Sequence, residues 1–242
     1  MPCEVRDLIR QMSKAKPLWG APRIHGELLK LGIEISQAAV SKHMRRPRKP
    51  PSQTWRTFLK NHAAEIASID FFTVPTAAFR VLYVFLVLSN DRWRVVHYNV
   101  TANPNAAWTG QQIVEAFPWD TVPRFLLRDR DGIYGTDFTR RVDSMGIEQI
   151  PIAAWSLWQN PFVERVIGSI RRECLDHVIV LNEMHLRRLL KEYLAYYHGF
   201  RTHLGLGKDC PKTRAVEPPA LGRIVELSMV GGLHHRYLRE AA

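Results

Sequence analysis

The sequence has few of the features that mark a secreted protein, a membrane protein or a zinc-stabilised domain. Its 242 residues include only three cysteines, Cys3, Cys174 and Cys210, with no Cys-x-x-Cys pair. Neither a structural zinc site nor a disulfide framework is therefore expected. The first residues contain no apolar segment of signal-peptide length, and the most apolar run, Val81 to Leu88, is too short to cross a bilayer. We expect a cytoplasmic protein with no membrane partner.

Acidic residues are the minority among the charged ones, and the imbalance is concentrated at one end. The chain carries 34 Lys and Arg against 23 Asp and Glu, a formal net charge of +11. Residues 1–62 hold 13 of the basic and 4 of the acidic residues, a net of +9, so the other 180 residues contribute only +2. Such a basic segment attracts polyanions, nucleic acid first and an anionic membrane second.

Apolar residues at helical spacing predict three short helices at the N-terminal end. Gly32 ends the second helix, and Ser36 can cap the third. Two helices separated by a tight turn that contains glycine form a helix-turn-helix, so residues 1–46 are predicted to be a helix-turn-helix DNA-binding domain. The apolar positions are Val5, Leu8, Ile9 and Met12 in the first helix, Ile24, Leu28 and Leu31 in the second, and Ala39, Val40 and Met44 in the third.

The third predicted helix and the residues after it are rich in side chains that contact DNA grooves and phosphates. The alternative is a small helical bundle with a solvated basic face. Prolines and positive charges after this helix favour extended backbone and predict a linker over residues 47–61. The predicted DNA-binding residues are Arg23, Gln37, Ser41, Lys42, Arg45, Arg46, Arg48 and Lys49.

After the linker the pattern changes to alternating strands and helices. Strands are predicted over residues 66–74, 81–88, 93–100, 125–128 and 147–152, and helices over 104–117, 136–145, 160–174 and 182–197. Short connections between the first three strands predict an antiparallel meander. The fold class is therefore α/β, a mixed five-stranded sheet flanked by helices. This core is expected to span residues 62–206, followed by a C-terminal tail over 207–242 to which the sequence assigns no function.

Three acidic residues fall where predicted strands and a helix would place them usefully. Asp70 interrupts an apolar strand, where a charge is costly unless it is paired or bound to metal. Asp129 directly follows the fourth strand, and Glu164 lies one turn into the helix that begins near Asn160, the expected N-cap. Each residue alone has an ordinary explanation, as a salt-bridged strand residue, a turn former or a helix-dipole partner.

The combination of these residues is more specific than any one of them. Carboxylates from three separate elements around one point are hard oxygen ligands that suit Mg²⁺ or Mn²⁺. A pair of such ions can activate an attacking hydroxyl and stabilise a leaving 3′ oxygen. We therefore predict that Asp70, Asp129 and Glu164 are catalytic residues and metal ligands, with Asp131 as the second choice for the middle ligand.

Five segments, in order, resemble the DDE integrases and transposases, especially the retroviral-integrase-like transposases of bacterial insertion sequences. Residues 18–25 are similar to the G-x-x-R-I helix-turn-helix that precedes these cores. Residues 68–71 carry the first aspartate, and 128–135 are similar to the D-R-G-x-x-Y segment around the second. Residues 158–174 match the N-x-x-x-E helix with its basic continuation. Residues 197–206 resemble the Y-N-x-x-R-x-H-x-x-L tail, with His198 in place of Asn and Thr202 in place of the common Pro.

This resemblance implies a ribonuclease H-like core that cleaves and joins DNA with two Mg²⁺ or Mn²⁺ ions. The implied partners are double-stranded DNA, both as element ends and as target, and further copies of the chain in a homo-oligomer on that DNA. A bacterial, nucleoid-associated location follows. The helix with Glu164 also carries Arg165, Arg171 and Arg172, which are expected to contact phosphates near the scissile bond; a solvated helix face is the alternative.

Three other functions stay open from the sequence. The core could belong to a ribonuclease H-like nuclease that cuts without joining. It could be catalytically decayed, which would leave a transposase-derived DNA-binding protein. The chain could also be a basic scaffold without chemistry. The intact acidic triad disfavours the last two, and the helix-turn-helix disfavours a generic ribonuclease H.

Overall fold

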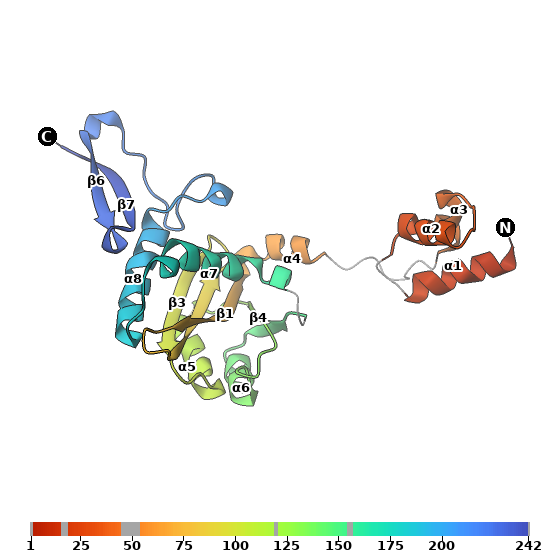
Figure 1. The fold of residues 1–242 in the computed structure, drawn as a ribbon, viewed down its shortest axis with the longest axis horizontal. Coiled ribbons are helices and arrows are strands. Elements are labelled where there is room, and N and C mark those ends of the chain that lie inside the picture. The colour runs from red at the N-terminus through yellow and green to blue at the C-terminus, as the bar shows by residue number, and fades with distance from the viewer. Residues whose placement is uncertain (1, 16–18, 45–53, 119–120, 154–156, 242) are drawn as a thin grey trace. The chain divides into compact units, whose positions relative to one another are not determined.

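The computed structural model describes residues 2–15, 19–44, 54–118, 121–153 and 157–241. The chain divides into two compact units, Met1–Thr54 and Trp55–Ala242 (Figure 1). The N-terminal unit contains α1 (Cys3–Ala15), α2 (Ala21–Lys30) and α3 (Gln37–His43). The three helices enclose a small core of their own, built on Ile9, Ile24, Leu28 and Val40.

The third helix begins as its sequence predicts. The Oγ of Ser36 accepts a hydrogen bond from the backbone N–H of Ala39 at 3.2 Å, which satisfies one of the free donors of the first turn of α3. Gly32, between α2 and α3, has a φ of 73°, a left-handed conformation that glycine adopts at little cost. The turn between the two helices is therefore fixed by local sequence.

The C-terminal unit is built on a five-stranded sheet in the order β3-β2-β1-β4-β5. The β1–β2 and β2–β3 pairs are antiparallel, whereas β1–β4 and β4–β5 are parallel. The predicted mixed sheet with an antiparallel first half is therefore confirmed. The strands are β1 (Ile66–Pro75), β2 (Val81–Ser89), β3 (Arg94–Thr101), β4 (Phe125–Arg128) and β5 (Glu148–Pro151).

Helices cover both faces of this sheet. One apolar layer joins the sheet to α5 (Ala106–Ala116) and α6 (Thr136–Ser144), through residues such as Ile69 and Phe138. The other joins it to α7 (Pro161–Glu173) and α8 (Glu183–Gly199), through residues such as Phe72 and Ile170. Figure 1 shows α5 and α6 on one side of the strands and α7 on the opposite side. A sheet buried on both faces explains why its central strands are almost continuously apolar.

The expected linker over residues 47–61 requires a correction in its second half. Residues Trp55–Asn61 form α4, and Leu59 on this helix is buried against Ile66, Phe125 and Leu127 of the sheet. Trp55, Phe58 and Leu59 stand at helical spacing, a signal that the preceding prolines and charges obscure. α4 is thus part of the core unit.

The expected tail over residues 207–242 is also structured. It contains a two-stranded antiparallel sheet of β6 (Arg223–Met229) and β7 (His234–Glu240). His234 stacks on Tyr196 of α8 at 4.3 Å between ring centroids, and its Nε2 donates to the backbone oxygen of Glu173 at 2.7 Å. These contacts attach the hairpin to α7 and α8. Across the described ranges, no helix is both long and apolar enough to span a membrane.

Candidate active site

The sheet itself places Asp70 next to Asp129. β1 and β4 are parallel neighbours, and their register pairs Ile66 with Phe125 and Ser68 with Leu127. Two residues further along each strand, the same register sets Asp70 opposite Asp129. Since side chains two residues apart point to the same face, both carboxylates follow Ser68 and Leu127 toward the α7 side of the sheet.

Helix α7 brings Glu164 to the same place, and a buried amide holds the start of this helix. Asn160 is only 3% exposed, and its Nδ2 donates to the backbone oxygen of Ile69 at 3.2 Å. Asn160 does stand at the N-cap position, but its side chain makes no capping hydrogen bond, which corrects the expected role. Its bond instead ties α7 to β1 at the residue that precedes Asp70.

The pKa of Asp70 records how close the three carboxylates are. Burial raises it, and the negative charges of Glu164 and Asp129 raise it further, to about 8. The backbone N–H of Phe71 donates to Oδ1 of Asp70 at 2.7 Å and opposes the shift only in part. At neutral pH the metal-free protein therefore holds a proton on Asp70, which Asp70 shares with Glu164.

The other two carboxylates are perturbed in the same direction. Burial raises the pKa of Asp129. Burial and the charge of Asp129 raise the pKa of Glu164, whereas the hydrogen bond from Asp70 lowers it. Within the described residues, no Lys, Arg or His forms an ion pair with any of these three side chains. The charge of Arg128 lowers the pKa of Asp129 without offsetting the effect of burial, so the cluster concentrates negative charge with no ion pair among the described residues. This is the electrostatic condition for binding a metal ion.

The three carboxylates are neighbours, but they are not yet arranged to ligate a single metal ion. In the part of the chain that is described, no three His, Cys, Asp or Glu side chains lie close enough together to ligate one ion. All three donors are hard oxygens, the chemistry that Mg²⁺ and Mn²⁺ select. The donor set fits such an ion, and the side chains would have to draw together to hold it.

Asp131, the second choice for the middle ligand, has a local structural role. Its backbone N–H donates to Oδ1 of Asp129 at 3.1 Å, and its own Oδ1 accepts from the backbone N–H of Ile133 at 2.9 Å. Asp131 is exposed, and these bonds shape the turn after β4. The geometry favours Asp129 as the residue beside Asp70.

Tyr134, in the segment after Asp129, packs beside the site. Its ring packs against Phe71 and Phe138, at 6.1 and 5.0 Å between centroids. Its hydroxyl is buried and has no hydrogen-bond partner among the described residues. Burial first, and the charges of Asp70 and Asp129 next, raise its pKa well above the usual range. The motif around Asp129 includes Tyr134, but its contact with Phe71 depends on the packing of β1 beside the loop after β4.

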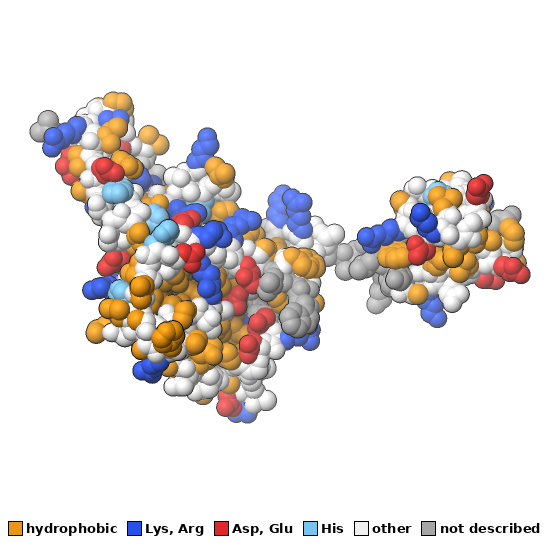
Figure 2. Space-filling view, in the orientation of Figure 1, with side chains coloured by type: hydrophobic (Ala, Val, Ile, Leu, Met, Phe, Trp, Pro, Cys, Tyr) orange, Lys and Arg blue, Asp and Glu red, His pale blue; other side chains and the backbone are white. Residues whose placement is uncertain are grey.

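The three arginines of α7 are exposed beside the carboxylates, in two different environments. Arg165 lies over the ring of Trp93 at 5.8 Å, and Arg171 donates to the backbone oxygen of Thr73 at 3.2 Å. Arg172 is exposed further along the helix. Figure 2 shows acidic side chains at the surface between α7 and α6, with Lys and Arg side chains beside them over α7. A basic margin around an acidic centre suits a substrate that is itself anionic.

The residues predicted to bind DNA in the N-terminal unit are distributed over α2 and α3. Gln37, Ser41 and Lys42 are exposed on α3, and Arg23 is exposed on α2 with its guanidinium 6.0 Å from the Trp19 ring. The other four predicted residues, Arg45, Arg46, Arg48 and Lys49, lie outside the described residues. Lys42 also shares a hollow of about 490 Å³ with Arg10 and Lys14 of α1.

Residues 197–206, the last of the five segments that resemble the DDE enzymes, take part in a network of hydrogen bonds and an ion pair. Arg201 pairs with Glu173 at 2.5 Å and donates to Nδ1 of His203 at 3.0 Å. Burial lowers the pKa of His198 to about 4, so this ring is neutral and its Nε2 accepts from the backbone N–H of Val95 at 3.0 Å. His198, which replaces the usual Asn, thereby fastens α8 to β3.

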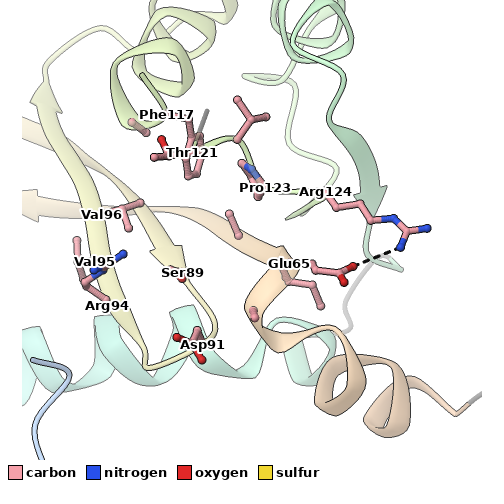
Figure 3. A pocket seen from close by; sticks show the side chains of 15 residues that line it. Glu65, Ser89, Asp91, Arg94, Val95, Val96, Phe117, Thr121, Pro123 and Arg124 are labelled. Atoms are coloured by element: carbon pink, nitrogen blue, oxygen red, sulfur yellow. Dashed lines mark hydrogen bonds and ion pairs between the residues drawn. The ribbon is translucent and has the colours of Figure 1, made fainter. Parts of the chain in front are cut away.

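Figure 3 shows a hollow of about 670 Å³ elsewhere on the core unit. It lies between the start of β1, the β2–β3 turn and the segment before β4, and the ion pair of Glu65 with Arg124 at 3.3 Å borders it. None of the predicted catalytic residues lines it.

Comparisons with known proteins agree with this architecture. The sequence model of the family described as "Integrase core domain" matches residues 145–211, which include Glu164 and neither aspartate. A search of curated proteins finds no match.

Solved structures share the fold at low identity. The Mos1 transposase catalytic domain with raltegravir and Mg superposes with a TM-score of 0.50 at 16% identity, over 58% of this chain and 75% of that one. The same domain with raltegravir and Mn gives a TM-score of 0.50 at 14% identity, over 62% and 85%. A chain of the simian T-cell lymphotropic virus intasome in complex with PP2A regulatory subunit B56 gamma gives 0.50 at 10% identity, over 95% and 86%. The expected ribonuclease H-like integrase fold is confirmed.

Proposed function

We propose that this chain, a member of the DDE integrase and transposase family, is a DNA strand transferase that uses Asp70, Asp129 and Glu164 as its catalytic carboxylates. The observation that carries the proposal is the convergence of these three side chains from β1, the end of β4 and α7. Burial and the charges of neighbouring carboxylates raise their pKa values, and no described cation forms an ion pair with them. Such a cluster of carboxylates destabilises the folded protein, and its presence therefore indicates a functional role.

The cofactor we propose is Mg²⁺ or Mn²⁺, two ions held by these carboxylates. The Mos1 structures with Mg and with Mn support the choice of a divalent ion. When bound, such ions supply Lewis-acid stabilisation of the attacking and leaving oxygens of an in-line displacement. The protein contributes oxygen ligands fixed by two neighbouring strands, a third ligand on a helix, and positive charge from α7 that would orient phosphates.

The proposed reaction has two displacement steps. In the first, the oxygen of a water molecule attacks a donor phosphate, its proton passes to solvent, and the 3′ oxygen leaves as a hydroxyl. In the second, that 3′ hydroxyl loses its proton to solvent and attacks a target phosphate. A new phosphodiester bond forms, and the 3′ oxygen of the target strand leaves as a hydroxyl. The proposed partners are double-stranded DNA ends and target DNA, with further copies of the chain assembled on them. A cytoplasmic, nucleoid-associated location is consistent with these partners.

A joining assay tests this function. Full-length protein, Mg²⁺ and a labelled duplex carrying a candidate element end are incubated with circular target DNA, and labelled product on the target is measured. A strand transferase gives labelled target, whereas a ribonuclease H-like nuclease gives only shortened donor. Metal-independent binding without either product would instead support the decayed, DNA-binding alternative.

The affinity for the metal should rise with pH. Because Asp70 carries a proton below its pKa of about 8, an ion must displace that proton to bind. We expect the association constant for Mn²⁺ to increase about tenfold per pH unit from pH 6 to 8 and then to level off. Calorimetric titration at several pH values measures this slope, and Asp131→Asn should leave it unchanged. An affinity independent of pH over this range would contradict the assignment of Asp70.

No covalent bond between protein and DNA should form during the reaction. The hydroxyl of Tyr134 lies within the electrostatic influence of Asp70 and Asp129, but its burial and its raised pKa make it a poor nucleophile. Labelled DNA in a denaturant-quenched reaction should migrate free of protein, for the parent chain and for Tyr134→Phe alike. A protein-linked label that Tyr134→Phe abolishes would move the chain to a different recombinase class.

A further inference from the structure

A hollow of about 630 Å³ lies on the same side of the sheet as the carboxylates, between α4, the β2–β3 turn and the start of α7. Its volume falls in the range of about 300–1,000 Å³ that is common for ligand pockets. The side chains that distinguish it are four aromatic and two basic ones: Trp55, Trp93, Trp158, Phe162, Arg56 and Lys60. Neither the carboxylate triad nor the α7 arginines line it.

The aromatic side of the hollow is held in place by its surroundings. Trp93 stacks on Phe162 at 6.0 Å with an interplanar angle of 25°. Gly205 approaches Trp93 so closely that a Cβ at this position would lie 2.3 Å from the indole. Trp55 donates from Nε1 to the backbone oxygen of Gln159 at 2.9 Å. These contacts leave fixed aromatic surfaces facing an open volume.

Trp158 makes no comparable contact with the described residues and is 64% exposed at the edge of the hollow. An exposed tryptophan beside fixed aromatic rings offers a π-face to a planar ligand. Arg56 and Lys60 stand one helical turn apart on α4, are exposed, and form no ion pair with a described acidic residue. Aromatic faces beside free cations suit a ligand that combines a ring with a phosphate.

A buried amide adds a specific polar group. Asn90, which also lines the hollow, is 2% exposed and accepts from the Ser68 hydroxyl at 2.9 Å through its Oδ1. Its Nδ2 is buried with no hydrogen-bond partner among the described residues, an arrangement that costs about 1–3 kcal/mol. The exposed carboxylate of Asp91 at the rim can accept from exocyclic amino groups. Both groups match the edge of a nucleobase.

The hollow is connected to the catalytic carboxylates through residues of β1 and α7. Ser68 precedes Asp70 by two residues on the same face of β1, and Pro161, which lines the hollow, lies one turn before Glu164 on α7. A DNA strand whose phosphate lies at the carboxylates would therefore have neighbouring nucleotides within reach of the hollow. A paired base cannot enter it, because its edge and both faces are already engaged in the duplex.

We infer that this hollow binds one unpaired nucleotide of the DNA strand, with the base against Trp158 and the Trp93–Phe162 pair and the phosphate at Arg56 and Lys60. This inference rests on the proposed function in taking DNA as the substrate. Stacking on an aromatic side chain contributes about 1–3 kcal/mol per base, and it accepts any base. The site is thus expected to select strand state and not sequence.

Binding of full-length protein to two duplexes in EDTA tests the inference. One duplex is blunt, and the other has a short single-stranded end that carries 2-aminopurine. We expect the overhang duplex to bind at least about tenfold more tightly, with quenched 2-aminopurine fluorescence. Trp158→Ala should remove both effects, Trp158→Phe should retain part of them, and the double variant Arg56→Gln/Lys60→Gln should weaken the preference. Phe79→Ala, which removes an aromatic side chain that is 95% exposed outside the hollow, is the matched control.

Equal affinity of the parent chain for the two duplexes would overturn the inference. So would a loss in Trp158→Ala that is equal for the blunt duplex, since this would mark a general duplex contact or a protein-docking surface. The joining assay separates these results from the proposed function. If the protein joins DNA but shows no preference for the overhang duplex, the proposed strand-transfer activity is supported and the inferred nucleotide site is refuted. A Trp158-dependent preference without joining does the reverse.

Discussion

Strand transfer should fall roughly a thousandfold or more in each of Asp70→Asn, Asp129→Asn and Glu164→Gln, while DNA binding stays within about twofold. Loss of groups that merely orient metal ligands typically costs 10–100-fold, so loss of a ligand itself should exceed about that range. The amides preserve shape, and in Asp70→Asn the amide oxygen could still accept the hydrogen bond from the backbone N–H of Phe71. Single-turnover joining rates and filter binding measure the two effects separately.

Asp131→Asn is the matched control for these substitutions. It removes one charge from the same turn as Asp129, and the amide oxygen could still accept from the backbone N–H of Ile133. Its joining rate should stay within about tenfold of the parent rate. A near-normal rate in Asp129→Asn together with a lost rate in Asp131→Asn would show that the middle ligand has been assigned to the wrong residue.

Stability gives an independent check that these losses are not due to misfolding. The folded-state pKa of Asp70, about 8, lies above its ordinary value of 3.8. The carboxyl therefore favours the folded, metal-free protein at low pH, and this contribution is lost as pH rises from 3.8 through 8, by at most about 1.4 kcal/mol per pH unit. Asp70→Asn should remove this dependence and raise the melting temperature at pH 8 and above.

The N-terminal unit should carry most of the affinity for duplex DNA. Residues 1–54 hold 11 basic and 4 acidic residues, a net of +7, whereas 55–242 net +4 over more than three times the length. A fragment of residues 1–54 has a separate core on Ile9, Ile24, Leu28 and Val40, so it is expected to fold alone. Each phosphate that it neutralises contributes roughly 0.9 to the log–log dependence of affinity on salt.

Titrations of both fragments at several salt concentrations test this division. The N-terminal fragment should lose affinity by roughly a hundredfold or more between 50 and 200 mM salt if it contacts several phosphates. The core fragment should bind more weakly, with a smaller slope. Lys42→Gln, at an exposed position of α3, should lower the slope by about one unit, whereas Lys30→Gln at the end of α2 serves as a charge-matched control. Equal affinities and slopes for the two fragments would refute the two-module arrangement.

Features encoded in short stretches of sequence were predictable. Three examples are the apolar strand β2, the short strand β4 before Asp129 and the N-cap at Ser36. Each depends only on neighbouring residues in the chain, and the structure has each where the sequence predicts it. The sequence analysis predicts a linker where α4 lies. Trp55, Phe58 and Leu59 have helical spacing, but the prolines and positive charges directly before them favour an extended linker. The hairpin of β6 and β7 was missed because its strands lie against α8 and are only half-buried, so their alternation is weak.

Features that depend on distant contacts were not predictable. Asn160 was expected to cap a helix, since its residue type and position fit that role, but its amide finds the backbone oxygen of Ile69, 91 positions away. The proximity of Tyr134 to Asp70 depends on the packing of β1 beside β4. The proton on Asp70 depends on burial and on two other carboxylates, none of which is a property of the strand that contains it.

The register of β1 and β4 has a consequence for how the candidate site forms during folding. A slip of one residue between these strands would turn Asp129 toward the layer of α5 and α6 and would bring an apolar side chain to the catalytic face. The same slip would turn the β4 residues that anchor each layer toward the opposite layer. The two aspartates can therefore lie side by side only in a correctly packed sheet. Formation of the candidate site thus depends on the same strand register as formation of the fold. A misfolded copy would lack the paired aspartates on which the proposed cleavage of DNA depends.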